Sequence, residues 1–219
     1  MMAVAIAVSM VMTACRSGRQ FTSNDAQTAK IKTVAILPVQ VNFTGNMPAK
    51  LTPAMLDSLK QQQSIGFQRA LESNLMRYSG GRSKVQGVSF QSVDKTNGVL
   101  QKNNMSWQSI ASRDPDELAR LLQVDAVVKM NVTSNRIMSD LASMGLGTLR
   151  NILFWGTNTS PGVTSAITNK TAQVYADCVL VKDGRTLWTA QYEKPTDWNT
   201  SANDVIASIT KKMGKGFPY

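Results

Sequence analysis

The side chains that most often perform catalysis are scarce in this sequence. Its 219 residues contain no histidine and two cysteines, Cys15 and Cys178. Without histidine there is no Ser-His-Asp or Cys-His pair, no imidazole metal ligand and no imidazole that titrates near neutral pH. Two thiolates alone make a poor zinc site. Cys178 lies in an apolar run and is expected to be buried and inert. We therefore expect neither a metal ion nor a cofactor.

Two groups of carboxylates are the remaining candidates for acid–base chemistry. The first is Asp114-Pro115-Asp116-Glu117. Its spacing is typical of a helix start, with Asp114 as the N-cap, proline in the first position and glutamate in the third. The second group is spread over an expected hairpin and its exit: Asp177, Asp183, Glu193 and Asp197. One alternative is that two carboxylates of this second group act as the acid and base of a glycan-hydrolysing enzyme. The sequence pattern does not indicate which two would act together, so we expect no enzyme.

The N-terminal fifteen residues, MMAVAIAVSMVMTAC, are uncharged and almost wholly apolar. Such a run is too short to span a bilayer, which takes about 20 residues, and has the length of the apolar part of a signal peptide. After Cys15 the composition turns polar, beginning with Arg16. We therefore expect residues 1–14 to be a signal peptide. A buried N-terminal helix is the alternative.

The junction Met12-Thr13-Ala14-Cys15 resembles the lipobox of bacterial lipoproteins, in which an apolar residue and two small residues precede a cysteine. The resemblance implies cleavage before Cys15 and attachment of a diacylglycerol to its thiol, with palmitate-like chains as the membrane anchor. Arg16 stands where lipoproteins of the inner membrane usually carry Asp, which implies the periplasmic side of the outer membrane. A cleaved signal peptide followed by a chance cysteine is the alternative.

Strand and helix patterns alternate from residue 31 onward. Strand patterns cover residues 31–39, 85–90, 124–132, 171–180 and 187–192. Helical patterns cover residues 51–78, the segment that begins at Asp114, and 201–215. Asp183-Gly184 is a hairpin-turn signal, and Pro38 is expected to stop the first strand. Residues 94–104 predict a polar loop.

This order of elements predicts an α/β (α+β) sandwich. We expect a mixed sheet of about five strands, with a C-terminal β-hairpin, flanked by about three helices. The single domain should span residues 31–219. The preceding residues 15–30 are polar and without apolar periodicity, which predicts a flexible tether.

Three segments resemble the TolB amino-terminal and CsgG-like class of envelope lipoproteins. They are Lys32–Val39, the pair Asp116–Ala119 and Val124–Lys129, and the hairpin Asp183–Trp188. The class includes the curli-secretion channel lipoprotein and the lipoprotein activators of penicillin-binding proteins. The resemblance implies a periplasmic α/β domain that serves as an accessory, scaffold or pore subunit.

Residues 139–161 form an apolar insertion between two predicted strands. A connection of more than about 15 residues in a compact domain is usually functional. One interpretation is a helix packed on the sheet; the other is a protrusion that contacts a partner or the bilayer. The candidate contact residues are Leu149, Ile152, Leu153, Phe154 and Trp155.

The formal net charge is +10, from 24 Lys and Arg against 14 Asp and Glu. A basic surface beside a lipid anchor could contact lipid phosphates or anionic envelope polymers, or could simply keep the domain soluble. The signal sequence and the lack of an aromatic and basic stacking motif argue against a nucleic-acid partner.

The leading hypothesis is a lipid-anchored, periplasm-facing outer-membrane lipoprotein, a non-enzymatic accessory or assembly factor in envelope biogenesis or export. Its partners would be the membrane and envelope proteins. The alternative is a self-associating subunit of a CsgG-like secretion pore.

Overall fold

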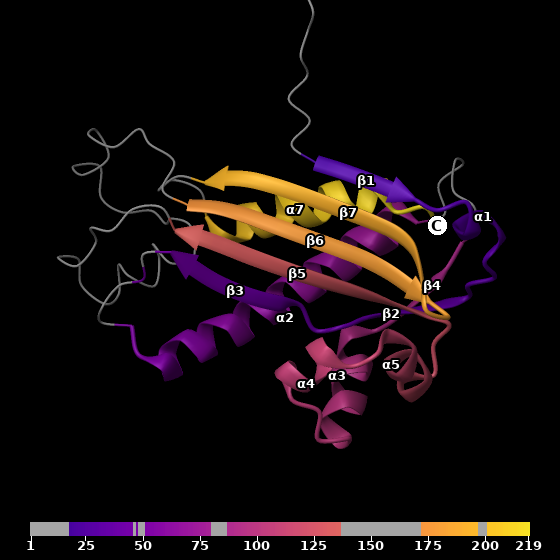
Figure 1. Cartoon of the computed structure of the whole chain (residues 1–219), viewed down its shortest axis with the longest axis horizontal. Coiled ribbons are helices and arrows are strands. Elements are labelled where there is room, and N and C mark those ends of the chain that lie inside the picture. Colours follow the sequence, from indigo (N-terminus) through magenta and orange to yellow (C-terminus); the bar gives the residue numbers. More distant parts are fainter. Residues whose placement is uncertain (1–17, 46, 48–50, 80–86, 137–171, 197–200) are drawn as a thin grey trace, which may run out of the picture.

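The computed structural model describes residues 18–45, 47, 51–79, 87–136, 172–196 and 201–219. Within them one mixed sheet has the strand order β1-β7-β6-β5-β2-β4, and β3 pairs with β5. The strands are β1 (Gly18–Thr22), β2 (Thr33–Ile36), β3 (Gln40–Gly45), β4 (Ser89–Gln91), β5 (Ala126–Arg136), β6 (Ala172–Lys182) and β7 (Arg185–Thr196). Figure 1 shows the long strands β5, β6 and β7 side by side in this sheet.

One stretch of chain supplies both β2 and β3, with a break at Pro38. Ile36 lies opposite Val128 of β5, whereas Gln40 lies opposite Asn131 of the same strand. Between these two pairs, the chain of β2 and β3 advances by four residues while β5 advances by three. Proline has no N–H to give to a ladder, which explains the interruption. The sequence predicts that the strand stops at Pro38, but it resumes as β3.

The predicted hairpin at Asp183 and Gly184 joins β6 to β7. Both turn residues have positive φ, 49° and 70°, which is typical of a type I′ turn that matches the twist of the strands. The two strands pair antiparallel along their length, with one irregularity after Leu180. This prediction from the sequence is confirmed.

Helices cover the two faces of the sheet to different extents (Figure 1). They are α1 (Asp25–Thr28), α2 (Pro53–Tyr78), α3 (Val93–Lys102), α4 (Trp107–Ser112), α5 (Pro115–Leu122) and α7 (Ala202–Gly216). α2 and α7 cover the face that carries Val34, Ile36 and Val128. α3, α4 and α5 cover the other face only over Ala35 and Val127 and their surroundings. None of the described helices is both long and apolar enough to cross a membrane.

A close approach fixes α7 against α2. A Cβ atom added to Gly214 would lie 2.7 Å from the carbonyl oxygen of Asn74, so only glycine allows this spacing. The Asn74 amide also donates to Thr210 Oγ1 at 3.0 Å. These contacts hold the backbone of α7 closely against α2.

The α/β class is confirmed, but the described residues hold a larger sheet and more helices than predicted: seven strands and six helices. The polar loop predicted over residues 94–104 is wrong over most of its length, because α3 occupies it. Only Val93, Thr96 and Leu100 of α3 are buried. Three buried residues in ten give too weak an apolar pattern to stand out in sequence.

The flexible tether predicted over residues 15–30 also needs correction over its described part, from residue 18. β1 pairs antiparallel with β7, and α1 follows it. Ala26 of α1 is fully buried, and its carbonyl accepts a hydrogen bond from the Tyr219 hydroxyl at 2.7 Å. Backbone pairing to a sheet edge needs no apolar side chain, so the composition does not reveal it.

Candidate functional site

The sequence-predicted contact residues lie outside the described residues. They are the lipidation site Cys15 and the apolar set Leu149, Ile152, Leu153, Phe154 and Trp155. Their roles remain predictions. The described chain begins three residues after Cys15, with Gly18 at the start of β1.

The structure brings two of the candidate carboxylates, Asp177 and Glu193, onto one face of the sheet. Asp177 lies opposite Gln191, and Glu193 is the next residue of β7 on that face, so the two are diagonal neighbours. Both side chains are exposed. A catalytic acid and its base need different environments, whereas Asp177 and Glu193 share one exposed environment on an open sheet face.

The other described candidates lie apart from Asp177 and Glu193. Asp183 lies in the hairpin turn and pairs with Lys182 at 3.0 Å; Asp197 lies outside the described residues. Asp114 caps α5 as predicted, accepting from the Asp116 N–H at 3.0 Å. In the described part of the chain, no three Cys, Asp or Glu side chains gather as metal ligands.

Cys178 is buried, as the sequence predicts. Its side chain is 1% exposed, on the face of β6 that packs against the helices. Burial, and then the charge of Asp177, raises the pKa of the thiol well above its usual range. Because only the thiolate is a strong nucleophile, a thiol held in its protonated form is unreactive.

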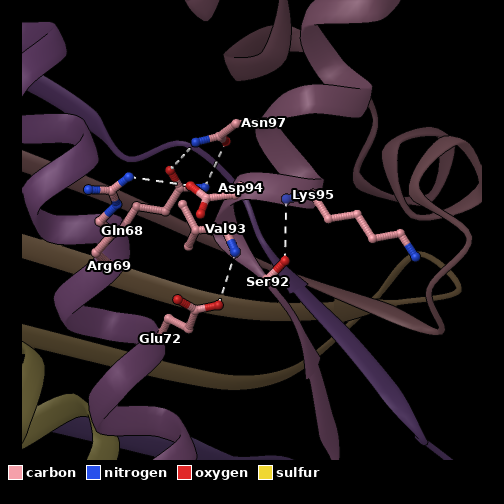
Figure 2. A network of polar contacts seen from close by, with 8 residues as sticks. All are labelled: Gln68, Arg69, Glu72, Ser92, Val93, Asp94, Lys95 and Asn97. Carbon is pink, nitrogen blue, oxygen red and sulfur yellow. Dashed lines mark hydrogen bonds and ion pairs between the residues drawn. The ribbon is translucent and has the colours of Figure 1, made fainter.

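A buried polar network joins α2 to α3 (Figure 2). The amides of Gln68 and Asn97 exchange two hydrogen bonds of 3.0 Å, and Gln68 Nε2 also donates to the Ile36 carbonyl at 2.8 Å. The Glu72 carboxylate accepts from the Val93 N–H at 3.0 Å. The polar atoms of Gln68, which is fully buried, are thereby satisfied. This network fixes α3 onto α2 and is structural.

The outer edge of the sheet, where β1 borders β7 and α7, presents charged and aromatic side chains. Arg19 lies opposite Gln191 and Phe21 opposite Thr189, both on the open face. Gln20 points the other way, where its amide donates to Tyr192 Oη and, at 3.2 Å, to the Lys212 carbonyl. β1 therefore presents alternate residues to the open face and to α7.

Two shallow hollows lie on the open face beside β1. One, of about 230 Å³, runs between Phe21, Thr189 and Val179. The other, of about 350 Å³, lies between Arg19, Tyr175 and Glu193. Their walls are side chains of neighbouring strands, so both are surface grooves. The sequence contains no signal for this edge, because four of the five residues of β1 are exposed and Gly18–Thr22 has no apolar alternation.

The comparisons with known proteins give distant likenesses of structure. No known protein family matches the chain, and no curated protein does. Among solved structures, the PelC dodecamer from Paraburkholderia phytofirmans is 11% identical, with 91% of this chain and 94% of that chain covered, at a TM-score of 0.41. Lipoprotein GNA1162 from Neisseria meningitidis is 15% identical, with 83% and 92% covered, at 0.39.

The LpoB C-terminal domain from Salmonella enterica is 9% identical, with 75% of this chain and 83% of that chain covered, at a TM-score of 0.34. TolB and CsgG are not among these three. Likenesses at these TM-scores decide neither the fold nor the function of this chain. Both rest on its own residues.

Proposed function

We propose that this protein is a lipoprotein of the outer membrane, anchored through Cys15 and facing the periplasm, that acts without catalysis as an accessory or assembly factor in envelope biogenesis or export. The observation that carries this proposal is the place of Cys15 in the sequence. The apolar residues 1–14 end at Cys15, and the sheet begins at Gly18. A folded domain thus starts directly after the residue to be lipidated.

The described residues support a binding role over a catalytic one. The chain has no histidine, and the Cys178 thiol is buried. Asp177 and Glu193 stand exposed on an open sheet face. The open face presents exposed charged and amide side chains, such as those of Arg19 and Gln191. Such a surface is suited to contact with another macromolecule.

The anchor is tested by Cys15→Ser, with Cys178→Ala as the matched cysteine control. Wild type and Cys178→Ala should incorporate labelled palmitate and partition into detergent, whereas Cys15→Ser should do neither. A lipid chain contributes about 0.8 kcal/mol per buried CH₂, so its loss should release the protein from the membrane. Equal labelling of wild type and Cys15→Ser would refute the lipoprotein proposal.

A self-associating pore subunit is the second candidate, and the two sheet edges favour it. In the described residues β1 pairs only with β7 and β3 only with β5. β1 and β3 run in opposite directions within the sheet, so β1 of one copy could extend the sheet of the next antiparallel to its β3. Such head-to-tail pairing generates a ring if the rotation between copies closes, and an open filament if it does not.

This pairing is tested at Thr22. The Ser23 N–H donates to the Leu187 carbonyl at 2.9 Å, so by alternation the N–H of Thr22 points away from β7. Thr22→Pro should remove this outward donor and reduce the mass of detergent extracts measured by light scattering, whereas Thr22→Val should not. Monomeric extracts of the wild type would exclude the pore.

A further inference from the structure

A basic surface runs along the outer edge of the molecule, where β1 and the last turns of α7 lie together. Its members are Arg19 of β1 and Lys211, Lys212 and Lys215 of α7, called here the basic edge. The two elements are joined by hydrogen bonds, because the Gln20 amide and the Tyr192 hydroxyl each donate to the Lys212 carbonyl at 3.2 Å. Cations from opposite ends of the sequence thus lie at one edge, with Arg19 on its open face and the lysines on the side of α7.

The four cations of the basic edge are exposed and of one sign. At 3.6 residues per turn, the three lysines fall within about 100° of the helix circumference. β1 contains no acidic residue, and the acidic residue of α7 is Asp204, in the first turn and far from the lysines. Asp177 and Glu193 share the open face with Arg19 and line one hollow with it, so they offset its charge. The positive charge of the basic edge therefore comes mainly from the three lysines of α7, which lie across the sheet from these carboxylates.

An exposed aromatic ring adjoins the basic edge. Phe21 is 61% exposed, the highest fraction among the large apolar side chains of the described residues. It lies two residues from Arg19 and on the same face of β1. An aromatic ring beside cations is the pairing that suits a membrane interface, where the ring enters the headgroup layer and the cations meet phosphates.

The chain length between the anchor and the edge decides which partner this surface can reach. Two residues, Arg16 and Ser17, lie between Cys15 and Gly18, so the Cα atoms of Cys15 and Gly18 are at most about 11 Å apart in an extended chain. That distance is close to the Debye length of about 8–10 Å, so charges near Gly18 interact with a charged membrane surface. Arg19 is the next residue along β1.

We propose that the basic edge binds the phosphate groups of anionic lipids in the membrane that holds the anchor, with Phe21 entering the interface. The proposal rests on lipidation at Cys15 for its geometry. It assigns the domain an orientation, with the edge formed by β1 and α7 against the bilayer and the edge formed by β4 away from it. The lipid chains and the basic edge are then two signals for one membrane, which together anchor more firmly than either alone.

The test measures binding of the full chain carrying Cys15→Ser to lipid vesicles, so that no acyl chain contributes. Vesicles of phosphatidylcholine alone are compared with vesicles that also contain phosphatidylglycerol. Residues 1–14 are uncharged, and their effect on binding should be equal for both vesicle types. The ratio of the two partition coefficients therefore reports the contribution of charge.

The variant Lys211→Gln, Lys212→Gln, Lys215→Gln should lower binding to the anionic vesicles by about fivefold per lysine, on the order of 100-fold in all. The matched control, Lys95→Gln, Lys102→Gln, Arg120→Gln, removes the same charge from α3 and α5. It should keep binding within about threefold of wild type, and added salt should abolish the difference between the two variants.

Phe21→Ser should lower binding to both vesicle types by the same factor, whereas Met55→Ser, at an exposed position of α2, should not. Equal loss in the lysine variant and its control would overturn the basic edge. The proposal would also be overturned if the lysine variant lost binding to soluble polyphosphate but kept binding to vesicles. The lysines would then bind a soluble anionic polymer and not the membrane.

Failure of the lipid anchor is distinguishable from failure of the basic edge. If palmitate labelling of the wild type is absent but the lysine variant loses vesicle binding, the anchor is wrong and the basic edge stands. If labelling is present and the lysine variant binds as well as its control, the anchor stands and the basic edge is wrong.

Discussion

Asp125 connects the starts of two central strands through one carboxylate oxygen. Its Oδ2 accepts the N–H groups of Lys32 and Thr33, each at 2.8 Å, and the Thr33 hydroxyl at 3.1 Å. The Thr33 N–H, with those weaker donors, lowers the pKa of the carboxyl below its usual 3.8, although partial burial acts in the opposite direction. A carboxylate so engaged holds β2 against β5 and is unavailable for chemistry.

Replacing Asp125 by alanine should lower the free energy of unfolding by about 1.5–3 kcal/mol at neutral pH, as expected for hydrogen bonds to a charged group. Because the folded pKa is depressed, the stabilisation is complete above about pH 4 and is lost as the pH falls through the folded value. Urea unfolding of wild type and variant should therefore converge in acid. Asp177→Ala, at an exposed position, should change stability by less than about 0.5 kcal/mol.

At the scale of residues, the sequence predicts what depends on near neighbours. The burial of Cys178 follows from the apolar run around it, and the N-cap at Asp114 follows from the proline and glutamate after it. The role of Asp125 could not be predicted, because its donors lie 92 and 93 residues away. The same holds for the basic edge, because Arg19 and the lysines of α7 come from opposite ends of the chain.

Helix α5 shows how an element can be defined at both ends by single residues. Asp114 supplies the N-cap, Pro115 occupies the first turn, and Gln123 ends the helix in the left-handed region with φ 56°. Leu118 and Leu122 are buried over the sheet. Each of these features is local, which is why this helix was predictable from the sequence.

Asp114→Ala should cost about 0.5–2 kcal/mol of stability, because the Asp116 N–H then loses its acceptor. Asp114→Asn keeps an acceptor oxygen and should stay within about 0.5 kcal/mol of wild type. Thermal or urea unfolding measures both. Membrane and partner binding at permissive temperature should survive in each variant, and loss of binding in a fully stable Asp114→Ala protein would instead indicate a functional carboxylate.

Elements that depend on distant pairing were harder to predict. β1 carries four exposed residues of five, so it lacks the alternation of a half-buried strand. β3 alternates, but over only six residues and with only Val41 buried. α3 rests on buried contacts of only three residues and on its link to Gln68. In these cases hydrogen bonds to other elements, and not side-chain patterns, decide the secondary structure.

At the scale of the whole molecule, the pairing of β5 with β6 indicates whether the residues between these strands are needed to join them. Arg136 and Ala172 are direct partners in the antiparallel register. A two-residue turn is therefore sufficient to join them. The 35 residues between them, outside the described part of the chain, are not needed for closure of this hairpin.

We expect that replacing residues 137–171 by Asn-Gly yields a chain with near-native circular dichroism and melting temperature, because β6 is also held by β7 along its length. If the apolar insertion is an interaction element, the shortened chain should lose its partner or oligomer, as measured by pull-down and light scattering. An unfolded product would show that the insertion belongs to the core. A folded product that still assembles would show that it contacts no partner.

The pairing of β1 with β7 has a consequence for export. Gly18 pairs with Tyr192, so the first strand of the sheet has no partner until nearly the whole chain has been synthesised. Distant pairings form late, because a long loop must be closed first. If residues 1–14 are a signal peptide and Cys15 is acylated, as proposed above, the chain reaches the acylating enzyme with β1 not yet paired to β7. The domain would then complete its sheet only after it is anchored at the membrane.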